Sequence, residues 1–364
     1  MKKSPIGLVV CLVICVAIGC QVHNSDCDSI VYHPRTFEGS IQIDDSLNTG
    51  FIYKVLKQHP FSSWVVYCLS ADTNTILLNY ISSDGNLIRI DLFDSTKVKV
   101  LPVRFIKQSL LDMSMQGDSL CLLDGQNKQF YLLAKDSLDR YVISSEVDLS
   151  PSFPPSLYIH FSYTASQFFF DHSNIYFSIG DLRDRNFLGE YSVGIFNINT
   201  HQLQLKYPYP SCYRNSDIYL ENTHFRPVAK NKMIFCYNYT DVIRCFDTLG
   251  HITFEVLPSN PERVREFEKQ KELNAAYVRK YVNTCDLNLG VTPLDTSGFF
   301  VFRRGSTKHL ADTPAYYCNY FTQDGDFRLT SIVKPVIARN IIQYKRGFLS
   351  LSIDMKSAYV YSLN

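Results

Sequence analysis

Five basic side chains in the second half of the chain could together bind an acidic ligand. They are His224, Arg226, Arg303, Arg304 and His309. Because a guanidinium group offers planar, paired hydrogen-bond donors, arginines gathered at one site favour a carboxylate or a sulfate group. Arginines and histidines in loops are also ordinary solvated surface residues. The five residues therefore predict an anion site if the fold brings them together, and a plain surface if it does not.

The motifs of familiar catalytic and metal sites are incomplete in this sequence. Segments 82–85 and 322–325 begin like the Asp box of sialidases, but both lack the later glycine and the tryptophan. Segment 324–326 lacks the remaining oxygen ligands of a calcium loop. We find no serine nucleophile elbow, phosphate-binding loop or helical histidine pair. The sequence therefore predicts no catalytic residue, no metal site and no cofactor.

The composition indicates an all-β protein. The chain has 24 tyrosines and 25 phenylalanines, and its β-branched residues lie between turns rich in Asp, Asn, Ser and Gly. This pattern is typical of many short strands. The formal net charge is +1 and no basic stripe runs along the chain, which argues against a nucleic-acid partner.

The first twenty residues predict export and lipid attachment. Lys2 and Lys3 precede an apolar run over residues 6–18, and Gly19 precedes Cys20. This arrangement is typical of an export signal, and it resembles a bacterial lipobox, in which the cysteine receives lipid and becomes the new N-terminus. A plain secretory signal and a retained membrane anchor are the alternatives, although the run is shorter than the roughly 20 residues that span a bilayer. We expect the protein in the cell envelope, tethered to the outer membrane through lipid on Cys20, and both the periplasmic face and the cell surface stay open.

These features divide the chain into three parts. Residues 1–19 are the predicted lipoprotein signal peptide, residues 20–37 the lipidated tether, and residues 38–364 one folded domain. An all-β domain of this length can be a single unit.

The cysteines of the mature chain have no spacing that predicts zinc. There is no Cys-x-x-Cys pair, and several cysteines stand inside apolar runs, as Cys68 and Cys236 do. A buried free cysteine behaves as a small hydrophobic residue. Export would permit disulfides, but nothing in the spacing pairs one cysteine with another, so both states stay open.

A repeated strand–turn–strand pattern predicts a β-propeller. Residues 78–90 and 317–329 match each other closely around Asp84-Gly85 and Asp324-Gly325, and looser copies place turns near residues 137, 200 and 250. A strand-built period of about 50 residues is typical of propeller blades. Three predicted C-terminal strands, at 340–344, 348–353 and 358–363, need a partner for their exposed edge. A strand at 40–44 can supply it and close a ring of six blades, or of seven if residues 51–56 and 63–69 are shared differently.

One helix interrupts this repeat at about residues 260–281. Ser259, Pro261 and Glu262 form a helix start, and we expect an insertion over one rim of the ring. It could be a lid or docking element, or a solvated linker.

Six triplets, each with Asp followed by Ser or Thr and then by an aliphatic residue or Thr, resemble the O-glycosylation acceptor of exported Bacteroidota proteins. The acceptor residues would be Ser29, Ser46, Ser95, Ser119, Ser137 and Thr248. Because Asp-Ser before an apolar residue is also what a turn entering a strand looks like, both interpretations stay open.

The lipobox followed by strand pairs with Asp-Gly turns resembles the lipoprotein β-propellers of unknown function found in Bacteroidota, which are similar in outline to six-bladed TolB-like propellers. The resemblance implies fold and location, and carries no set of catalytic residues. We therefore expect a membrane-tethered binding or scaffolding module for a protein or glycan partner. The alternative is a carbohydrate-active or other hydrolytic or lyase enzyme, with His224, Arg226, Arg303 and His309 at the mouth of the channel.

Overall fold

The structure is a computed structural model of the chain. It describes residues 29–31, 41–62, 67–71, 75–104, 111–160, 168–183, 189–209, 223–229, 232–237, 242–247, 251–257, 287–294, 298–305, 307, 312–322, 327–332, 341–345, 347–352 and 354–363. The predicted signal peptide with Cys20, the predicted helix at 260–281, Thr248 and His309 lie outside the described residues.

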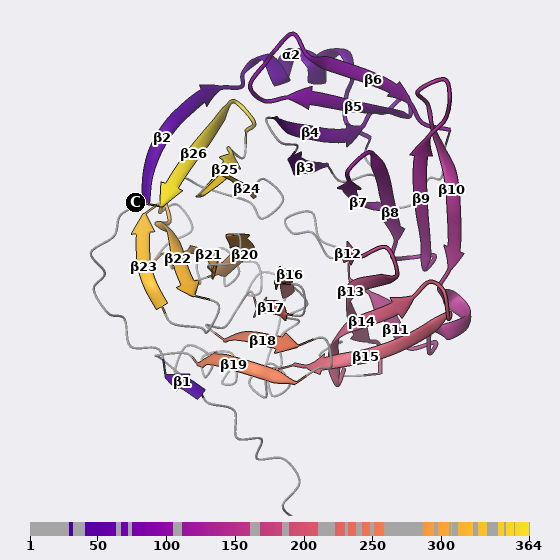
Figure 1. Ribbon diagram of the computed structural model, residues 1–364, viewed down its shortest axis with the longest axis vertical. Coiled ribbons are helices and arrows are strands. Elements are labelled where there is room, and N and C mark those ends of the chain that lie inside the picture. The colour runs from indigo at the N-terminus through magenta and orange to yellow at the C-terminus, as the bar shows by residue number, and fades with distance from the viewer. Residues whose placement is uncertain are drawn as a thin grey trace, which may run out of the picture.

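The described strands form six sheets arranged around a central axis, which confirms the predicted six-bladed β-propeller (Figure 1). We number the sheets as blades 1 to 6 and give the strands of each from the axis outward. Blade 1 consists of β3 (Cys68–Ala71), β4 (Ile76–Ile81), β5 (Asn86–Asp91) and β6 (Val98–Pro102). Blade 2 consists of β7 (Leu111–Gln116), β8 (Ser119–Asp124), β9 (Gln129–Lys135) and β10 (Tyr141–Asp148).

In blade 3, two short strands share the inner edge. The blade consists of β11 (Leu157–Ile159) and β12 (Phe168–Phe170), which both pair with β13 (Asn174–Asp181), followed by β14 (Tyr191–Asn197) and β15 (Gln202–Pro208). Blade 4 consists of β16 (Thr223–Ala229), β17 (Lys232–Tyr237), β18 (Ile243–Asp247) and β19 (Ile252–Leu257). Blade 5 consists of β20 (Leu287–Leu294), β21 (Gly298–Arg304), β22 (Tyr316–Thr322) and β23 (Phe327–Ile332).

Blade 6 joins the two ends of the chain. It consists of β24 (Ile341–Tyr344), β25 (Gly347–Leu351), β26 (Ser357–Leu363) and, at its outer edge, β2 (Ile41–Asn48). β2 pairs with β26 in antiparallel register from Ile41 opposite Leu363 to Asn48 opposite Ser357. The predicted closure of the ring by an early strand is confirmed, and it covers the edge that β26 would otherwise expose.

A second N-terminal strand adds to blade 4. β1 (Ser29–Val31) pairs in parallel with the outer strand β19, with Ser29 opposite Glu255 and Val31 opposite Leu257. The chain therefore contacts the outside of the ring at blade 4 before it enters blade 6.

The two segments that match most closely in sequence occupy different positions in their blades. Residues 78–90 form the hairpin of the second and third strands of blade 1, whereas residues 317–329 belong to the third and fourth strands of blade 5. The turn of blade 1 that corresponds to those near 137, 200, 250 and 325 lies instead between β5 and β6, at Asp94. The predicted hairpins are therefore confirmed, but the first copy lies one strand out of phase with the others.

Residues 51–56, considered as strand for a seventh blade, are helical. They lie in α2 (Phe51–Gln58), whose Ile52 is fully buried and whose Phe51, Val55 and Leu56 pack beside it against the strands of blades 6 and 1. This spacing of apolar residues is that of one helix face. A short 3-10 turn, η1 (Ser150–Ser152), links blades 2 and 3. In the described part of the chain, no helix is long and apolar enough to cross a bilayer.

The hydrophobic core is divided into wedges between neighbouring blades. The described residues form six buried clusters, and each draws its members from two adjacent blades. Because each sheet is apolar on both faces, the blades stabilise one another all round the ring, and the inner strands are held around the central channel.

Candidate functional site

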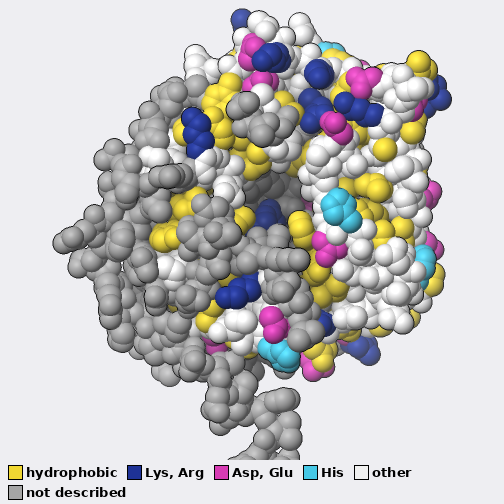
Figure 2. Space-filling model, viewed as in Figure 1, with side chains coloured by type: hydrophobic (Ala, Val, Ile, Leu, Met, Phe, Trp, Pro, Cys, Tyr) yellow, Lys and Arg dark blue, Asp and Glu magenta, His cyan; other side chains and the backbone are white. Residues whose placement is uncertain are grey.

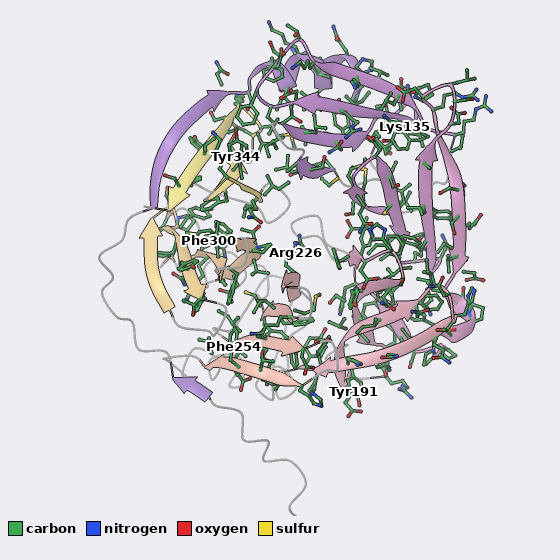
Figure 3. All side chains as sticks on the ribbon, viewed as in Figure 1. Lys135, Tyr191, Arg226, Phe254, Phe300 and Tyr344 are labelled. Atoms are coloured by element: carbon green, nitrogen blue, oxygen red, sulfur yellow. The ribbon has the colours of Figure 1, made fainter. Side chains whose placement is uncertain are left out.

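The central channel contains a cavity to which all six blades contribute. Its volume is about 240 Å³, and its lining residues come from the inner strands or the segments beside them: Tyr67, Cys68, Leu69, Met113, Ser114, Phe168, Phe169, Arg226, Thr292, Pro293, Ile341, Ile342 and Gln343. Figure 2 shows the middle of this face hollowed, with basic side chains inside the hollow. Arg226 lies at the centre of the ring (Figure 3).

The lining of this channel cavity is mainly apolar, with one charge. Arg226, half-buried in β16, is the one charged residue among its described lining residues. Ser114, Thr292 and Gln343 add hydrogen-bonding groups. Since water screens charges poorly in such a recess, a guanidinium group there attracts an anionic group more strongly than it would on an open surface. The cavity can therefore accommodate a carboxylate or sulfate against an apolar wall.

The other predicted binding residues lie elsewhere. Arg303 and Arg304 end β21, the second strand of blade 5, where Arg303 pairs with Asn288 and Tyr317; neither arginine lines the channel cavity. His224 lies two positions before Arg226 in β16, opposite Cys236. Its side chain and all of His309 fall outside what the structure describes. Of the five predicted residues, the structure thus places Arg226 in the cavity.

A second cavity lies on one rim of the channel, between blades 1 and 2. This rim pocket has a volume of about 330 Å³ and is lined by Leu69, Ser70, Ala71, Leu77, Arg89, Met115, Gly117, Asp118 and Ile342. Leu69 and Ile342 also line the channel cavity, so the two cavities are neighbours. The sequence did not identify this pocket, because its polar residues come from separate strands and a turn.

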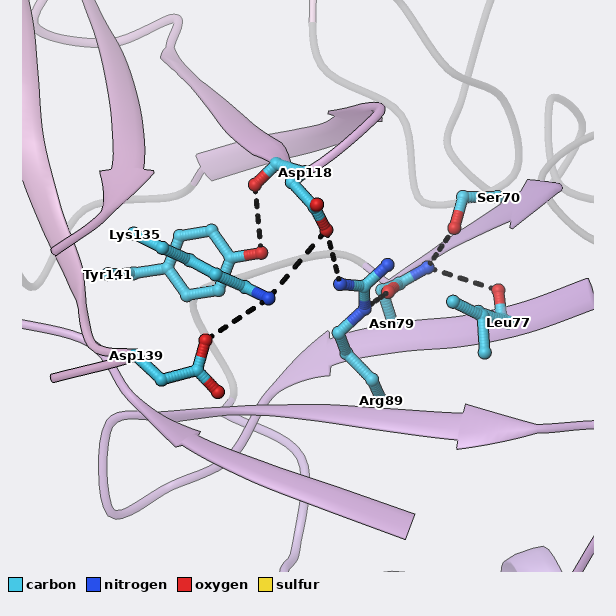
Figure 4. A network of polar contacts seen from close by, with 8 residues as sticks. All are labelled: Ser70, Leu77, Asn79, Arg89, Asp118, Lys135, Asp139 and Tyr141. Atoms are coloured by element: carbon cyan, nitrogen blue, oxygen red, sulfur yellow. Dashed lines mark hydrogen bonds and ion pairs between the residues drawn. The ribbon is translucent and has the colours of Figure 1, made fainter. Parts of the chain in front are cut away.

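A polar network forms one side of the rim pocket (Figure 4). Arg89 in β5 donates from Nε to Asn79 Oδ1 at 3.1 Å and from Nη1 to Asp118 Oδ1 at 3.3 Å. Lys135 Nζ lies 3.7 Å from the same Asp118 oxygen and 3.2 Å from Asp139 Oδ1. Arg89 and then Lys135 lower the pKa of the Asp118 carboxyl group below its ordinary value, so this group is ionised at neutral pH.

Hydrogen bonds behind the network hold it in place. Asn79 is fully buried and donates to Ser70 Oγ at 2.8 Å and to the Leu77 carbonyl at 3.0 Å. The buried Tyr141 donates its hydroxyl to the backbone carbonyl of Asp118 at 3.0 Å, which fixes the turn between β7 and β8. A buried Asn–Arg pair inside otherwise apolar strands was a signal in the sequence, but nothing in it indicated Asp118 as the partner.

The predicted glycosylation acceptors lie in different environments. Ser95 and Ser137 are exposed in turns, and Ser119 is half-buried at the start of β8. Ser29 and Ser46 lie in β1 and β2, and their side chains are not described. The preceding Asp94 accepts hydrogen bonds from Thr96 and Asp136 from Leu138, as the turn interpretation requires. Exposure leaves glycosylation open at Ser95 and Ser137.

Buried cysteines and potential metal ligands do not form a further site in the described residues. Cys121, Cys245 and Cys318 are buried free thiols. Burial raises the pKa of the Cys121 thiol to about 12 and that of Cys318 well above its ordinary value, so both stay protonated. No group of His, Cys, Asp or Glu residues in this part of the chain is arranged to hold a metal ion.

Comparisons with known proteins show a likeness of fold. No protein-family model and no curated protein sequence matches the chain. The structure is similar to a member of the DUF4221 family from Bacteroides vulgatus, with a TM-score of 0.62 and 8% sequence identity over 91% of this chain and 99% of that chain. It is also similar to a protein of Bacteroides fragilis described as a candidate exported protein, with a TM-score of 0.45 and 11% identity over 84% of this chain and 79% of that chain. At 8% identity, the first of these comparisons shows a likeness of fold alone.

Proposed function

We propose that this protein is an exported, lipid-anchored binding module whose channel cavity takes an acidic group of a glycan or protein partner. The observation that carries the proposal is the position of Arg226. It brings a positive charge into a mainly apolar cavity to which all six blades contribute. A guanidinium group in an apolar recess attracts an anionic group more strongly than one in open water does, so such a cavity favours a ligand that brings a carboxylate or sulfate.

Binding accounts for this cavity better than catalysis does. Glycoside hydrolysis requires a pair of carboxyl groups, and other hydrolytic mechanisms require a positioned acid or base. The described lining residues of the channel cavity include neither a carboxylate nor a histidine. No observation therefore favours the enzyme alternative.

The N-terminal segment supports a close attachment to the membrane. Cys20 is the predicted lipid acceptor, and Ser29, nine residues later, already begins the strand paired with β19. Nine residues span at most about 30 Å. A lipid on Cys20 would therefore hold the outer edge of blade 4 within about 30 Å of the bilayer.

The channel proposal is tested by direct binding. Purified full-length protein in detergent is titrated with sulfated and uronic-acid oligosaccharides, and with acidic peptides as a second panel. We expect Arg226→Gln to weaken binding at least tenfold, because the hydrogen-bonded ion pair is lost. Arg183→Gln is the matched control, since that arginine is 76% exposed and pairs with Asp181, and neither residue lines the channel cavity. Equal binding by the wild type and the Arg226 variant would refute the proposal.

The lipid anchor is tested separately. We expect the wild type to incorporate labelled palmitate and to fractionate with membranes, and Cys20→Ser to do neither. Unlabelled wild-type protein in the soluble fraction would contradict the anchor without affecting the channel experiment.

A further inference from the structure

We propose that the rim pocket between blades 1 and 2 binds a neutral sugar ring through Arg89, Asp118 and Ser70. This site goes beyond the channel proposal, because none of these three residues lines the channel cavity. The pocket volume of about 330 Å³ lies at the lower end of the range for small-ligand pockets, which is roughly 300–1,000 Å³.

The charges of the network favour a ligand without net charge. Two cations, Arg89 and Lys135, face two carboxylates, Asp118 and Asp139, and each ion pair is made within the network. An added carboxylate would lie beside Asp118, and an added ammonium would lie beside Arg89. A neutral group avoids both repulsions.

The pocket retains hydrogen-bonding capacity of both kinds. Among the described residues, neither Nη2 of Arg89 nor Oδ2 of Asp118 has a hydrogen-bond partner. Ser70 Oγ accepts a hydrogen bond from Asn79, which leaves its own proton available to donate. A hydroxyl group both donates and accepts, so neighbouring hydroxyls on one ring can donate to Asp118 and accept from Arg89 and Ser70.

These groups are already held in position. The Arg89 side chain is 10% exposed and is fixed by the buried Asn79, while Tyr141 holds the turn that carries Asp118. A ligand therefore does not have to order a mobile arginine, which lowers the entropic cost of binding.

The remaining walls suit the apolar side of a sugar ring. Leu69, Met115 and Ile342 line the pocket together with the polar groups. A sugar ring has C–H groups on its faces and hydroxyls at its edge, which matches a site with apolar walls and a few fixed polar groups.

The test measures binding of neutral sugars to purified full-length protein. The probes are glucose, galactose, mannose, fucose and N-acetylglucosamine, together with their short oligosaccharides. Saturation-transfer NMR detects binding, and calorimetry measures the affinity. We expect at least one probe to bind, and Asp118→Asn to weaken it at least tenfold. Asp118 is 79% exposed, so this variant should fold. Failure of every probe at millimolar concentration, or equal binding by Asp118→Asn, would overturn the proposal.

Two controls separate this site from its neighbours. Asp354→Asn removes another exposed carboxylate that lies beside a lysine, Lys356, but Asp354 belongs neither to the network nor to the pocket lining. We expect this variant to bind like the wild type, and an equal loss in both variants would overturn the assignment to Asp118. Arg226→Gln should leave neutral-sugar binding unchanged. If it abolished that binding, the sugar would occupy the channel cavity and the rim-pocket proposal would fail.

Discussion

Two interfaces of the ring are filled by different kinds of side chain. One lies between blades 5 and 6, and the other between blades 1 and 2. Between blades 5 and 6, Phe348 packs on Tyr361, Phe302 and Phe300, with ring centroids 4.5, 4.9 and 5.2 Å apart. Between blades 1 and 2, leucines such as Leu87 and Leu122 fill one part, and the Arg89–Asp118 bridge crosses another. The interface between blades 5 and 6 is filled by these aromatic side chains. The Arg89–Asp118 pair, which we call the polar bridge, instead borders the rim pocket.

Stability and the proposed binding therefore depend on different interfaces of the ring. Aromatic rings bury large areas and contribute most of the packing energy of a core. A pair such as Arg89 and Asp118, with one partner 79% exposed, contributes at most about 1 kcal/mol. The interface between blades 1 and 2 can therefore present polar groups to a ligand at little cost to the fold.

The largest expected loss of stability follows from removing the aromatic side chain of Phe348, which lies between blades 5 and 6. Phe348→Ala should lower the free energy of unfolding by about 3–5 kcal/mol, because it leaves a cavity among fully buried rings. Denaturant unfolding measures the change. Phe93→Ala is the control, since Phe93 is 39% exposed and should cost much less. Equal losses in the two variants would show that the buried rings between blades 5 and 6 contribute no more stability than a half-exposed ring does.

A smaller loss is expected when the buried support of the polar bridge is removed. Asn79→Ala should cost about 1–3 kcal/mol, because Nε of the buried Arg89 loses its acceptor. The control is Asn86→Ala, which removes an exposed hydrogen bond to Asp84 and should change stability by less than about 0.5 kcal/mol. If Asn79→Ala were neutral in thermal and denaturant unfolding, the bridge would not depend on its buried partner.

Removing one hydroxyl from the same interface should have a modest effect. Tyr141→Phe keeps the buried ring and deletes the hydrogen bond to the Asp118 carbonyl, at a cost of about 1 kcal/mol. Denaturant midpoints with an unchanged slope would confirm a pure stability effect. A loss of stability as large as that of Phe348→Ala would mean that this one hydroxyl contributes as much as the buried Phe348 side chain.

The smallest effect concerns Asp118 and depends on pH. Because its pKa is lowered in the folded protein, its contribution is fully present above the unfolded value of about 3.9 and is lost as the pH falls through the lower folded value. Asp118→Asn should therefore cost less than about 1 kcal/mol near pH 7. The difference from the wild type should disappear once the pH lies below the lowered pKa of Asp118 in the folded protein. A difference that grew on acidification would contradict this assignment.

Local patterns in the sequence predicted the hairpins well. Asp84-Gly85 marks a turn because Gly85 adopts a φ of 81°, which a glycine tolerates without strain. The strands on either side, β4 and β5, lie where the sequence indicated. The same local signal occurs near residue 325, yet there it joins the third strand to the fourth. A turn motif specifies that two strands pair, and says nothing of which pair within a blade they form.

The helix α2 and the polar bridge show why other features were missed. Residues 51–56 form a short apolar run, and such a run fits a strand or a helix until its neighbours are known. Its Ile52 is buried where blades 6 and 1 meet, and that junction exists only after the ring closes. Arg89 and Asp118 are 29 positions apart, in different blades, and no pattern along the chain joins them.

Turn chemistry, strand alternation and residue type are local properties, so the all-β class, the hairpins, the closing strand and five anion-binding candidates could be predicted from the sequence. The packing of the blades places Arg226 in the channel, whereas Arg303 and Arg304 do not line it. It also decided that Arg89 meets Asp118 at a pocket. These outcomes depend on how neighbouring blades pack, and the packing energy comes from contacts between residues far apart in the chain.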